Sequence, residues 1–281
     1  MRTQERPNRL PPWFKVRLST DERFTTVRSL IRNNKLHTVC TSAACPNRNE
    51  CWNAGTATFM ILGSVCTRGC GFCNISKGTP DRLDPDEPVR VADAVASLKL
   101  TYAVITSVTR DDLADGGAGM FADTIRAIHE RSPECRVEVL IPDFQGSGDS
   151  LRTVLDARPD VLNHNVETVP SLYPLVRPKA DYQRSLELLM RAKTHGAATK
   201  TGLMLGLGEG IDEVLAVMDE LRRIGCDLLT LGQYLLPHKG ALEVIKYYHP
   251  DEFRMLRDDA LSKGFKRVVA GPLVRSSYHA Q

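Results

Sequence analysis

The sequence predicts an α/β protein whose core is a partial barrel of six β/α units, (β/α)6, with an extension at each end. Three observations predict this fold class. Strand-like and helix-like segments alternate almost to the end of the chain, which is typical of parallel β/α units. A length of 281 residues suits one barrel with appendages. Hydrophobic residues at 42% and charged residues at 25% are the proportions of a globular protein and exclude disorder, collagen and coiled coil.

The expected strands are short runs of apolar or β-branched residues. They are 58–63, 102–108, 137–143, 161–168, 199–207 and 226–234. Apolar residues at helical spacing predict the helices between them, at 89–99, 118–131, 150–157, 182–194, 212–223 and 251–263. Right-handed crossovers place the loops that follow the strands on one face, where such folds keep their chemistry.

Glycine and aspartate mark several expected helix ends. Gly196 and Gly225 lie where helix C-caps fall. Asp212 can cap the helix that follows the GLGEG segment, and capping is also the expected role of Asp115. Asp111 and Asp112 follow the second strand in the same loop as Asp115, so they are expected on the active face. The alternative role for Asp111 and Asp112 is helix capping, as for Asp115.

We expect three segments: an N-terminal extension (1–54), the barrel (55–265) and a C-terminal segment (266–281). No window holds 18 uninterrupted apolar residues, and the start of the chain has charge and proline where a signal peptide needs an apolar run. We therefore expect no membrane span and a cytoplasmic location, or an equivalent reducing compartment.

Six of the eight cysteines lie between residues 40 and 73, and a reducing compartment keeps such thiols free. CTRGCGFC places Cys66, Cys70 and Cys73 in the loop after the first strand, with Gly69 and Gly71 free to adopt positive φ values. Structural zinc sites use four ligands, whereas a 4Fe-4S cube held by three thiolates keeps one iron open. An open iron can be chelated by amino and carboxylate groups. A zinc loop or scattered thiols remain the alternative.

This CxxxCxxC loop after the first strand of a partial β/α barrel resembles the radical S-adenosylmethionine superfamily. The resemblance implies that the open iron binds the methionine part of S-adenosylmethionine, and that an electron from the cluster generates a 5′-deoxyadenosyl radical. It also implies that the segment GLMLGLGE, with Gly206 and Glu209, contacts the adenine end of the cofactor.

Four further polar residues are candidates for binding the cofactor. Asn165 and Glu167 share one face of a strand by period-two alternation, and we assign them to ribose or methionine contacts. Lys200 and Gln233 lie near strand ends, where they could meet the cofactor or the substrate. Equally, neighbouring residues of the barrel rim could satisfy them.

A second triplet, Cys40, Cys45 and Cys51, precedes the first, and its spacing of x4 and x5 belongs to no common zinc finger. Together with RSSYHA at 275–280, and with PPWFKVR, TSVTRDDLADGGA, VLIPDF and HNVETV, it resembles the lipoyl synthase family. The resemblance runs from about Pro11 to the C-terminus.

That resemblance implies sulfur insertion at C6 and C8 of an octanoyl group that is amide-linked to a lysine of a carrier protein. The carrier would be a lipoyl domain or an H protein of the glycine cleavage type. An aliphatic C–H bond has no acidic proton, so acid–base chemistry cannot open it and a radical precursor is required. The implied cofactors are two 4Fe-4S clusters and S-adenosylmethionine, with the auxiliary cluster on the second triplet as the sulfur source.

In the family a serine oxygen completes the auxiliary cluster, and it maps to Ser277, with Arg275 and Tyr278 as anchors of the turn. The alternative interpretation is that Ser276 and Ser277 only form an ordinary C-terminal turn. An electron donor such as flavodoxin or ferredoxin, and an iron-sulfur carrier that renews the cluster, are the other expected partners. No nucleic acid is expected, because no RNA-binding motif is present.

Two cysteines and two histidines have plain structural interpretations. Cys135 and Cys226 lie at strand starts, away from the reactive face, and are expected to be small buried hydrophobic residues. His37 and His164 could ligate metal, but hydrogen bonding is the favoured role because cysteines already supply three ligands for each cluster.

Other classes of protein fit less well. Methylthiotransferases carry an N-terminal domain and a C-terminal RNA-binding module, for which the chain leaves no room. Biotin synthase-like enzymes hold their second cluster with cysteines on barrel strands, and here only two isolated cysteines are associated with strands. A non-catalytic iron-sulfur carrier or a zinc scaffold would leave the open iron without purpose. Iron, zinc and sulfide analysis together with cleavage of S-adenosylmethionine would separate these classes.

The basic residues are concentrated at the N-terminus. Residues 1–36 hold nine Lys and Arg against three Asp and Glu, whereas the remainder holds 28 against 31. Such a run is either a solvated face or a docking element for an acidic partner. Because the family's carrier domains are typically acidic, we expect electrostatic docking by Arg2, Arg6, Arg9, Lys15 and Arg17.

Overall fold

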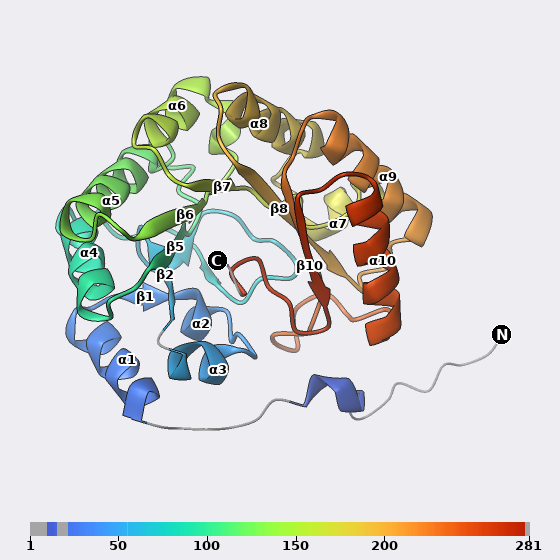
Figure 1. Cartoon of the computed structure of the whole chain (residues 1–281), viewed down its shortest axis with the longest axis horizontal. Helices are drawn as coiled ribbons and strands as arrows, with labels where there is room; N and C mark the ends of the chain where they lie inside the picture. Colours follow the sequence, from blue (N-terminus) through green and yellow to red (C-terminus); the bar gives the residue numbers. More distant parts are fainter. Residues whose placement is uncertain (1–9, 16–21, 55, 279–281) are drawn as a thin grey trace.

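The computed structural model describes residues 10–15, 22–54 and 56–278. Eight strands form one curved sheet in the order β1, β2, β5, β6, β7, β8, β9, β10, and helices cover its outer side (Figure 1). Neighbouring strands pair in parallel except β1 and β2, which are antiparallel. The ring of strands stays open between β1 and β10, and α2, α3 and the C-terminal segment lie in that opening (Figure 1).

The strands of the sheet are β1 (His37–Thr38), β2 (Thr58–Ile61), β5 (Tyr102–Ser107), β6 (Arg136–Leu140), β7 (Val161–Asn163), β8 (Thr199–Leu205), β9 (Leu228–Gln233) and β10 (Arg267–Gly271). A separate pair follows β2 and consists of β3 (Val65–Cys66) and β4 (Ser76–Lys77). The longer helices are α1 (Glu22–Asn33), α4 (Glu87–Ser97), α5 (Ala118–Arg131), α6 (Gly148–Asp156), α8 (Tyr182–Thr194), α9 (Ile211–Arg223) and α10 (Pro250–Ser262). The short helices are α2 (Val39–Ser42), α3 (Arg48–Asn53) and α7 (Tyr173–Val176), with 3-10 turns at Pro12–Phe14, Phe144–Gly146 and Pro170–Leu172.

The predicted partial barrel is confirmed. Each of the six expected strands and each of the six expected helices is present, with ends that differ from the expected ones by at most five residues. Two strands of the sheet were not predicted. β1 has two residues, too few to show a periodic pattern. β10 lies in the expected C-terminal segment, and it pairs with β9 in parallel over its full length.

The expected helix caps are confirmed with one exception. Gly196 and Gly225 have φ values of 86° and 79°, which suit glycine at a helix C-terminus. Asp115 accepts hydrogen bonds from the amides of Gly117 (2.9 Å) and Gly119 (2.8 Å), where α5 begins. The prediction that Asp212 caps α9 is wrong. Gly210 is the N-cap residue, and its amide donates to the Glu213 carboxylate at 2.8 Å, so Asp212 lies inside the first turn.

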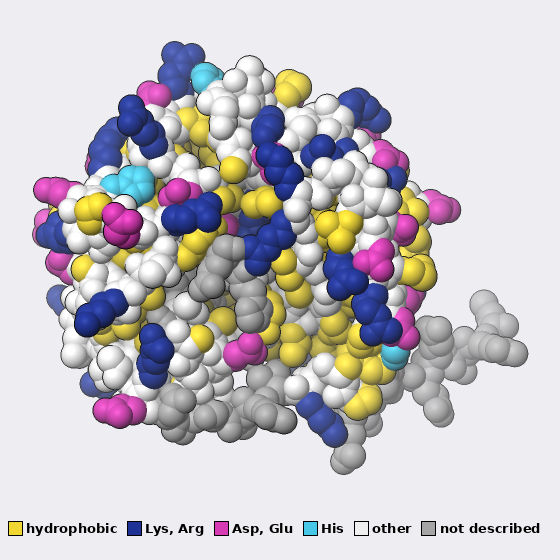
Figure 2. Space-filling view, viewed as in Figure 1, with side chains coloured by type: hydrophobic (Ala, Val, Ile, Leu, Met, Phe, Trp, Pro, Cys, Tyr) yellow, Lys and Arg dark blue, Asp and Glu magenta, His cyan; other side chains and the backbone are white. Residues whose placement is uncertain are grey.

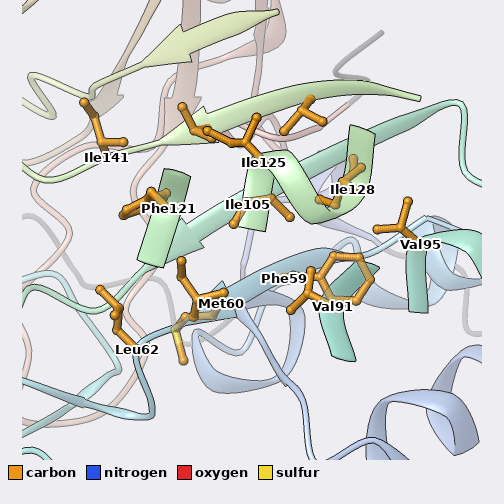
Figure 3. Close-up of a cluster of buried hydrophobic side chains, with 14 of the residues drawn as sticks. Phe59, Met60, Leu62, Val91, Val95, Ile105, Phe121, Ile125, Ile128 and Ile141 are labelled. Atoms are coloured by element: carbon orange, nitrogen blue, oxygen red, sulfur yellow. The ribbon is translucent and has the colours of Figure 1, made fainter. Parts of the chain in front are cut away.

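The outer face of the sheet carries the hydrophobic core. Side chains of β2 and β5 that point outward meet α4 and α5, and Figure 3 shows this contact. Phe59, Ile105, Phe121, Ile125 and Ile128 are all completely buried there. Because burial of this kind fixes strands and helices relative to one another, the loops at the strand ends start from rigid positions.

The described residues include no helix that is long and apolar enough to cross a membrane.

Candidate active site

The loop with the first cysteine triplet is attached to the barrel by backbone hydrogen bonds. Gly71 donates its amide to the carbonyl of Val176 and accepts from the amide of Leu242, both at 2.9 Å. A Cβ atom on Gly71 would lie 2.8 Å from the Leu242 side chain, so this position requires glycine for close approach. The expected positive φ values at Gly69 and Gly71 are wrong, since neither residue has left-handed backbone. The loop is instead held close to the barrel by α7 and by the segment around Leu242, which both pack against Gly71.

The three thiols of this loop are free and partly buried. Burial raises the pKa of Cys70, and it raises the pKa of Cys73 to about 11, with the charges of Cys70 and Cys66 adding to the effect on Cys73. The thiols therefore lie close enough to interact electrostatically. Soft thiolates are the ligands of iron-sulfur clusters, and a bound metal deprotonates them. This donor set fits a 4Fe-4S cluster.

Arg68, inside the CTRGCGFC motif, anchors the same loop to the loops after β5 and β6. Its guanidinium is buried and contacts Asp111 at 2.7 and 2.8 Å and Asp143 at 2.6 Å. Burial opposes the ionisation of Asp143, but Arg68 nevertheless holds the pKa of this carboxyl at about 2. Asp111 was expected on the active face, and the structure places it there as the partner of Arg68. Asp112 instead pairs with Arg110 at 2.8 Å.

The second triplet lies in the opening of the barrel, on and around α2 and α3. Burial raises the pKa of Cys40, and burial together with the charges of Cys40 and Cys45 raises the pKa of Cys51 to about 12. These three thiols are therefore neighbours. The Asn74 side chain, directly after Cys73, donates to the carbonyl of Ser42 at 2.9 Å. The two cysteine segments are in direct contact.

The packing of the N-terminal extension holds the second triplet in place. Val27 and Ile31 of α1 are buried in the main hydrophobic core, and Phe24 stacks on Trp52 of α3 with ring centroids 5.1 Å apart. Thr56 donates its hydroxyl to the carbonyl of Cys51 at 3.0 Å. Residues 22–54 of the extension thus form a folded support for these cysteines.

The C-terminal segment reaches the second triplet from across the barrel. Asn47 donates its side-chain amide to the carbonyl of Leu273 at 2.7 Å, and the Tyr278 hydroxyl donates to Glu50 at 2.9 Å. Arg275 is partly buried, which lowers its pKa, and the charge of Cys45 partly offsets that effect. The contacts of Leu273 and Tyr278 thus join the residues on both sides of Ser277 to the segment that carries the second triplet.

Asn165 and Glu167 are brought together just beyond the end of β7. Asn165 donates its side-chain amide to Glu167 at 3.1 Å and to the hydroxyl of Ser276 at 2.6 Å. In the described part of the chain the side-chain oxygen of Asn165 has no hydrogen-bond partner although it is buried. Glu167 has φ of 69°, and burial raises the pKa of its carboxyl. A buried acceptor that lacks a donor is suited to a ligand hydroxyl.

Gly206 and Glu209 form a compact turn after β8. The Glu209 carboxylate accepts from the amides of Gly206 (2.6 Å) and Leu207 (2.9 Å). A Cβ on Gly206 would lie 2.1 Å from the Gln233 side chain, so a side chain there would displace this turn. Gln233 is satisfied by backbone groups: it donates to Lys246 and accepts from Tyr248, both at 2.9 Å.

Lys200 is not brought to this turn. It is the second residue of β8, near the amino end of the strand, whereas Gly206 follows the last. Its ammonium is buried and contacts both carboxylate oxygens of Glu138, at 2.9 and 3.0 Å. The residues expected to contact the cofactor are therefore not all at one end of the barrel. Lys200 lies toward the amino ends of the strands, whereas Gly206 and Glu209 follow the carboxyl end of β8.

Arg177 is a site residue that the sequence analysis did not single out. Its guanidinium is buried and donates to the carbonyl of Asn165 at 3.0 Å and to the hydroxyl of Tyr173 at 3.0 Å. Burial opposes its charge, but Tyr173, Glu167 and Cys70 raise the pKa of Arg177 above its usual value. It is a fixed positive charge beside the first triplet. A buried, paired arginine has no periodic signature in sequence, and only its contacts reveal it.

The remaining candidates take structural roles. Cys135 and Cys226 are buried at strand starts, as predicted. His164 is buried, with Nδ1 2.9 Å from the carbonyl of Ile141 and Nε2 3.1 Å from the hydroxyl of Ser185. The expected hydrogen-bonding role of His164 is confirmed. His37 lies in β1, beside the second triplet.

No three of the described His, Cys, Asp and Glu side chains converge closely enough to ligate one metal ion. In a 4Fe-4S cube each cysteine binds a different iron, so its ligands do not need to meet at one point. The lack of three converging side chains therefore does not count against a cube at either triplet.

Together, the partial barrel and the cysteine loop after its first strand define a radical S-adenosylmethionine enzyme. The radical SAM superfamily matches residues 60–221 of the chain. A crystal structure of methylornithine synthase shares the fold with a TM-score of 0.55 at 14% identity, covering 89% of this chain and 82% of that one. Membership of the superfamily implies a 4Fe-4S cluster and S-adenosylmethionine as cofactors.

Curated relatives define the enzyme more narrowly. The lipoyl synthase of Halalkalibacterium halodurans is 54% identical over 283 residues, which cover 100% of this chain and 93% of the relative. The lipoyl synthase of Bacillus subtilis is 55% identical over 275 residues, covering 97% and 92% of the two chains. The chain belongs to the lipoyl synthase family. It is a sulfurtransferase of the radical S-adenosylmethionine class.

Proposed function

We propose that the chain inserts two sulfur atoms, at C6 and C8, into an octanoyl group held by an amide bond on a lysine of a carrier protein. The observation that carries this proposal is the pair of cysteine triplets, which meet at the contact between Asn74 and Ser42. One triplet suits the generation of a radical. The other, buried in the opening of the barrel, suits the storage of sulfide close to the same interior.

The first triplet is the proposed holder of the cluster that reduces S-adenosylmethionine. When bound, these groups supply a radical strong enough to remove hydrogen from an aliphatic carbon. The loop residues keep Cys66, Cys70 and Cys73 in fixed positions through Gly71 and Arg68. The protein's task is thus to orient the cofactor.

Four residues are proposed to contact S-adenosylmethionine. Asn165 offers its unpartnered carbonyl oxygen to a ribose hydroxyl, and Glu167 lies 3.1 Å from the same side chain. Gly206 and Glu209 shape the turn against which the adenine lies. This assignment is supported by the position of all four residues at or beyond the carboxyl ends of β7 and β8, where β/α barrels bind their ligands.

The second triplet is proposed to hold the auxiliary 4Fe-4S cluster, with Ser277 as its fourth ligand. The contacts of Asn47 with Leu273 and of Tyr278 with Glu50 support this assignment, because they join the C-terminal segment to residues that neighbour Cys45 and Cys51 in the chain. A hard alkoxide is a weaker partner for iron than a thiolate, so this corner is suited to release. The segments 1–54, 55–265 and 266–281 then serve to hold sulfur, to generate the radical and to close the auxiliary site.

The test is anaerobic reconstitution with iron and sulfide, followed by mass spectrometry of a peptide with an octanoylated lysine. The expected product is the dithiol, heavier by two sulfur atoms with no net change in hydrogen; oxidation of the peptide afterwards closes the ring and removes two hydrogens. Release of 5′-deoxyadenosine without a sulfur-containing peptide would contradict the proposed function. If the purified chain contains zinc and no sulfide, that result would contradict its assignment as a radical S-adenosylmethionine enzyme.

The proposed partners are an octanoylated lipoyl domain or H protein, a flavodoxin or ferredoxin as electron donor and an iron-sulfur carrier, in the cytoplasm. Docking of an acidic carrier is assigned to the basic N-terminus. Of its five residues Lys15 is exposed, while Arg2, Arg6, Arg9 and Arg17 lie outside the described residues.

This docking model predicts that the Kd of an intact carrier rises with salt, because the Debye length is about 8 Å near physiological ionic strength. Anisotropy titrations at low and high salt measure the effect. A Kd that does not respond to salt would show that the N-terminus is only a solvated arm.

A further inference from the structure

The part of the C-terminal segment that follows β10, residues 272–278, turns back along β9. It runs from the end of β10 toward the middle of the ring of strands (Figure 1). Val274 lies beside Gly232, near the carboxyl end of β9, and Tyr278 lines the same cavity as Leu228, the first residue of that strand. The segment therefore runs antiparallel to β9, from the carboxyl ends of the strands toward their amino ends.

Two glycines of the barrel strands make room for these residues. A Cβ on Gly232 would lie 2.1 Å from the carbonyl oxygen of Val274, and a Cβ on Gly202 would lie 3.2 Å from the hydroxyl of Ser276. Glycine within a strand often marks a place where another part of the chain approaches closely. The two glycines therefore let the C-terminal segment lie directly against β8 and β9, with Ser276 at the level of Gly202.

Ser276 is the residue of this segment that contacts the proposed cofactor site. Asn165 donates its side-chain amide to the hydroxyl of Ser276 at 2.6 Å, across 111 residues of sequence. Lys and Arg side chains lie over the face seen down the barrel in Figure 2, but neither Ser276 nor Asn165 is charged. Their contact is therefore a hydrogen bond between neutral groups, which salt does not screen as it screens ion pairs.

The neighbours of Asn165 select one orientation of its side-chain amide. Such an amide has two N–H hydrogens and one carbonyl oxygen. One hydrogen is donated to Glu167 at 3.1 Å and the other to Ser276. The carbonyl oxygen is buried and has no partner among the described residues, so it is the group that remains for a ligand. Without the hydroxyl of Ser276, the second N–H would be left without this acceptor, and the amide would lose one of the two contacts that orient it.

We propose that Ser276 is a positioning residue for S-adenosylmethionine and that it acts through Asn165. Its hydroxyl oxygen holds the second amide hydrogen, which fixes the direction of the Asn165 carbonyl oxygen toward a ribose hydroxyl. The two adjacent serines of the C-terminal segment then serve different groups: Ser276 serves the cofactor, whereas Ser277 serves the auxiliary cluster. This inference rests on the proposed contact of Asn165 with S-adenosylmethionine.

The first experiment measures the Kd of S-adenosylmethionine for the reconstituted enzyme by anaerobic equilibrium dialysis. Ser276→Ala is expected to raise this Kd about tenfold, the effect of losing one well-oriented hydrogen bond. Ser262→Ala is the matched control, because the exposed Ser262 donates its hydroxyl to the carbonyl of Asp259 within α10, and its Kd is expected to equal that of the wild type. A wild-type Kd in Ser276→Ala would overturn the inference.

A double-mutant cycle separates positioning from a general loss of structure. Asn165→Ala removes the oxygen that Ser276 is proposed to orient. Adding Ser276→Ala to Asn165→Ala is then expected to raise the Kd by less than about twofold, because residues that act as one unit are not additive. A further increase of about tenfold in the double variant would show that Ser276 acts independently of Asn165, and the inference would fail.

Iron analysis distinguishes this role from ligation of the auxiliary cluster. Ser276→Ala is expected to keep the iron and sulfide content of the wild type, because Ser277 is the proposed ligand. Loss of iron from Ser276→Ala together with a wild-type Kd would assign Ser276 to the auxiliary cluster and overturn the inference.

The positioning role and the proposed function fail separately in these experiments. Non-additive effects in the cycle, without sulfur insertion by the wild-type enzyme, would support the positioning role and contradict the proposed function. Sulfur insertion by the wild type with additive effects in the cycle would support the function and contradict the positioning role.

Discussion

The two cysteine triplets are held by different kinds of contact. The first lies in one loop, and hydrogen bonds and ion pairs from neighbouring strand ends fix it, with Arg68 as the main anchor. The second depends on contacts between the two ends of the chain, such as Asn47 with Leu273, 226 residues apart. The first triplet is therefore built into the barrel. The second triplet is held partly by contacts between segments from the two ends of the chain.

Replacing one cysteine of each triplet by alanine tests whether the two triplets have different roles. These substitutions have the largest expected effect on activity. Cys70→Ala is expected to abolish formation of 5′-deoxyadenosine, because the cluster that reduces S-adenosylmethionine loses one of three ligands. Cys45→Ala is expected to retain that cleavage and to lose all sulfur insertion. Liquid chromatography of 5′-deoxyadenosine and mass spectrometry of the peptide measure the two outcomes. Equal loss of cleavage in two folded variants would show that the triplets do not divide the work.

Substitution of Ser277 sharpens the comparison at the second triplet alone. Ser277→Ala is expected to cleave S-adenosylmethionine and to give no lipoyl product. Ser277→Cys is expected to keep the auxiliary cluster but to slow sulfur insertion, because a thiolate holds iron more firmly than an alkoxide does. Mössbauer spectra and single-turnover rates report the cluster and its reaction. Wild-type insertion by Ser277→Ala would remove this residue from the mechanism.

The free energy of unfolding tests whether Arg68 anchors the loop that carries the first triplet. Among the described residues, Arg68→Met leaves the completely buried Asp143 carboxylate with the partly exposed Arg184 at 3.3 Å as its one charged partner, beside the backbone amide of Gln145 at 3.1 Å. Loss of one partner of a buried ion pair typically costs about 3 to 5 kcal/mol, so a large decrease in the free energy of unfolding is expected. Arg126→Met breaks an exposed pair with Asp123 and serves as the control, with an expected loss below about 1 kcal/mol. Similar losses in both variants would contradict the anchoring role.

The sequence predicted what depends on local pattern. Periodicity indicated the six β/α units, and cysteine spacing indicated both triplets. It could not predict β10 as part of the sheet, because pairing with β9 decides that. It also missed Arg177, and it could not reveal that Lys200 pairs with Glu138 rather than with residues at the opposite end of β8. These features depend on the register of strands that are distant in sequence, which a single sequence does not encode in any local pattern.

The smallest expected effect concerns pH and the barrel wall behind the first triplet. Burial, assisted by the nearby charge of Arg177, lowers the pKa of His164 to about 4, against an ordinary value of 6.5. The unfolded chain therefore binds more protons than the folded chain between pH 6.5 and 4, and stability falls as the pH decreases through this window. Between pH 7 and pH 5 the loss from this group is about 2 kcal/mol. His164→Gln removes the titration, so urea unfolding of the variant should lose less stability than the wild type over that interval. Identical pH dependence in both proteins would show that His164 becomes charged in the folded state, and that the wall behind the first triplet is open to water.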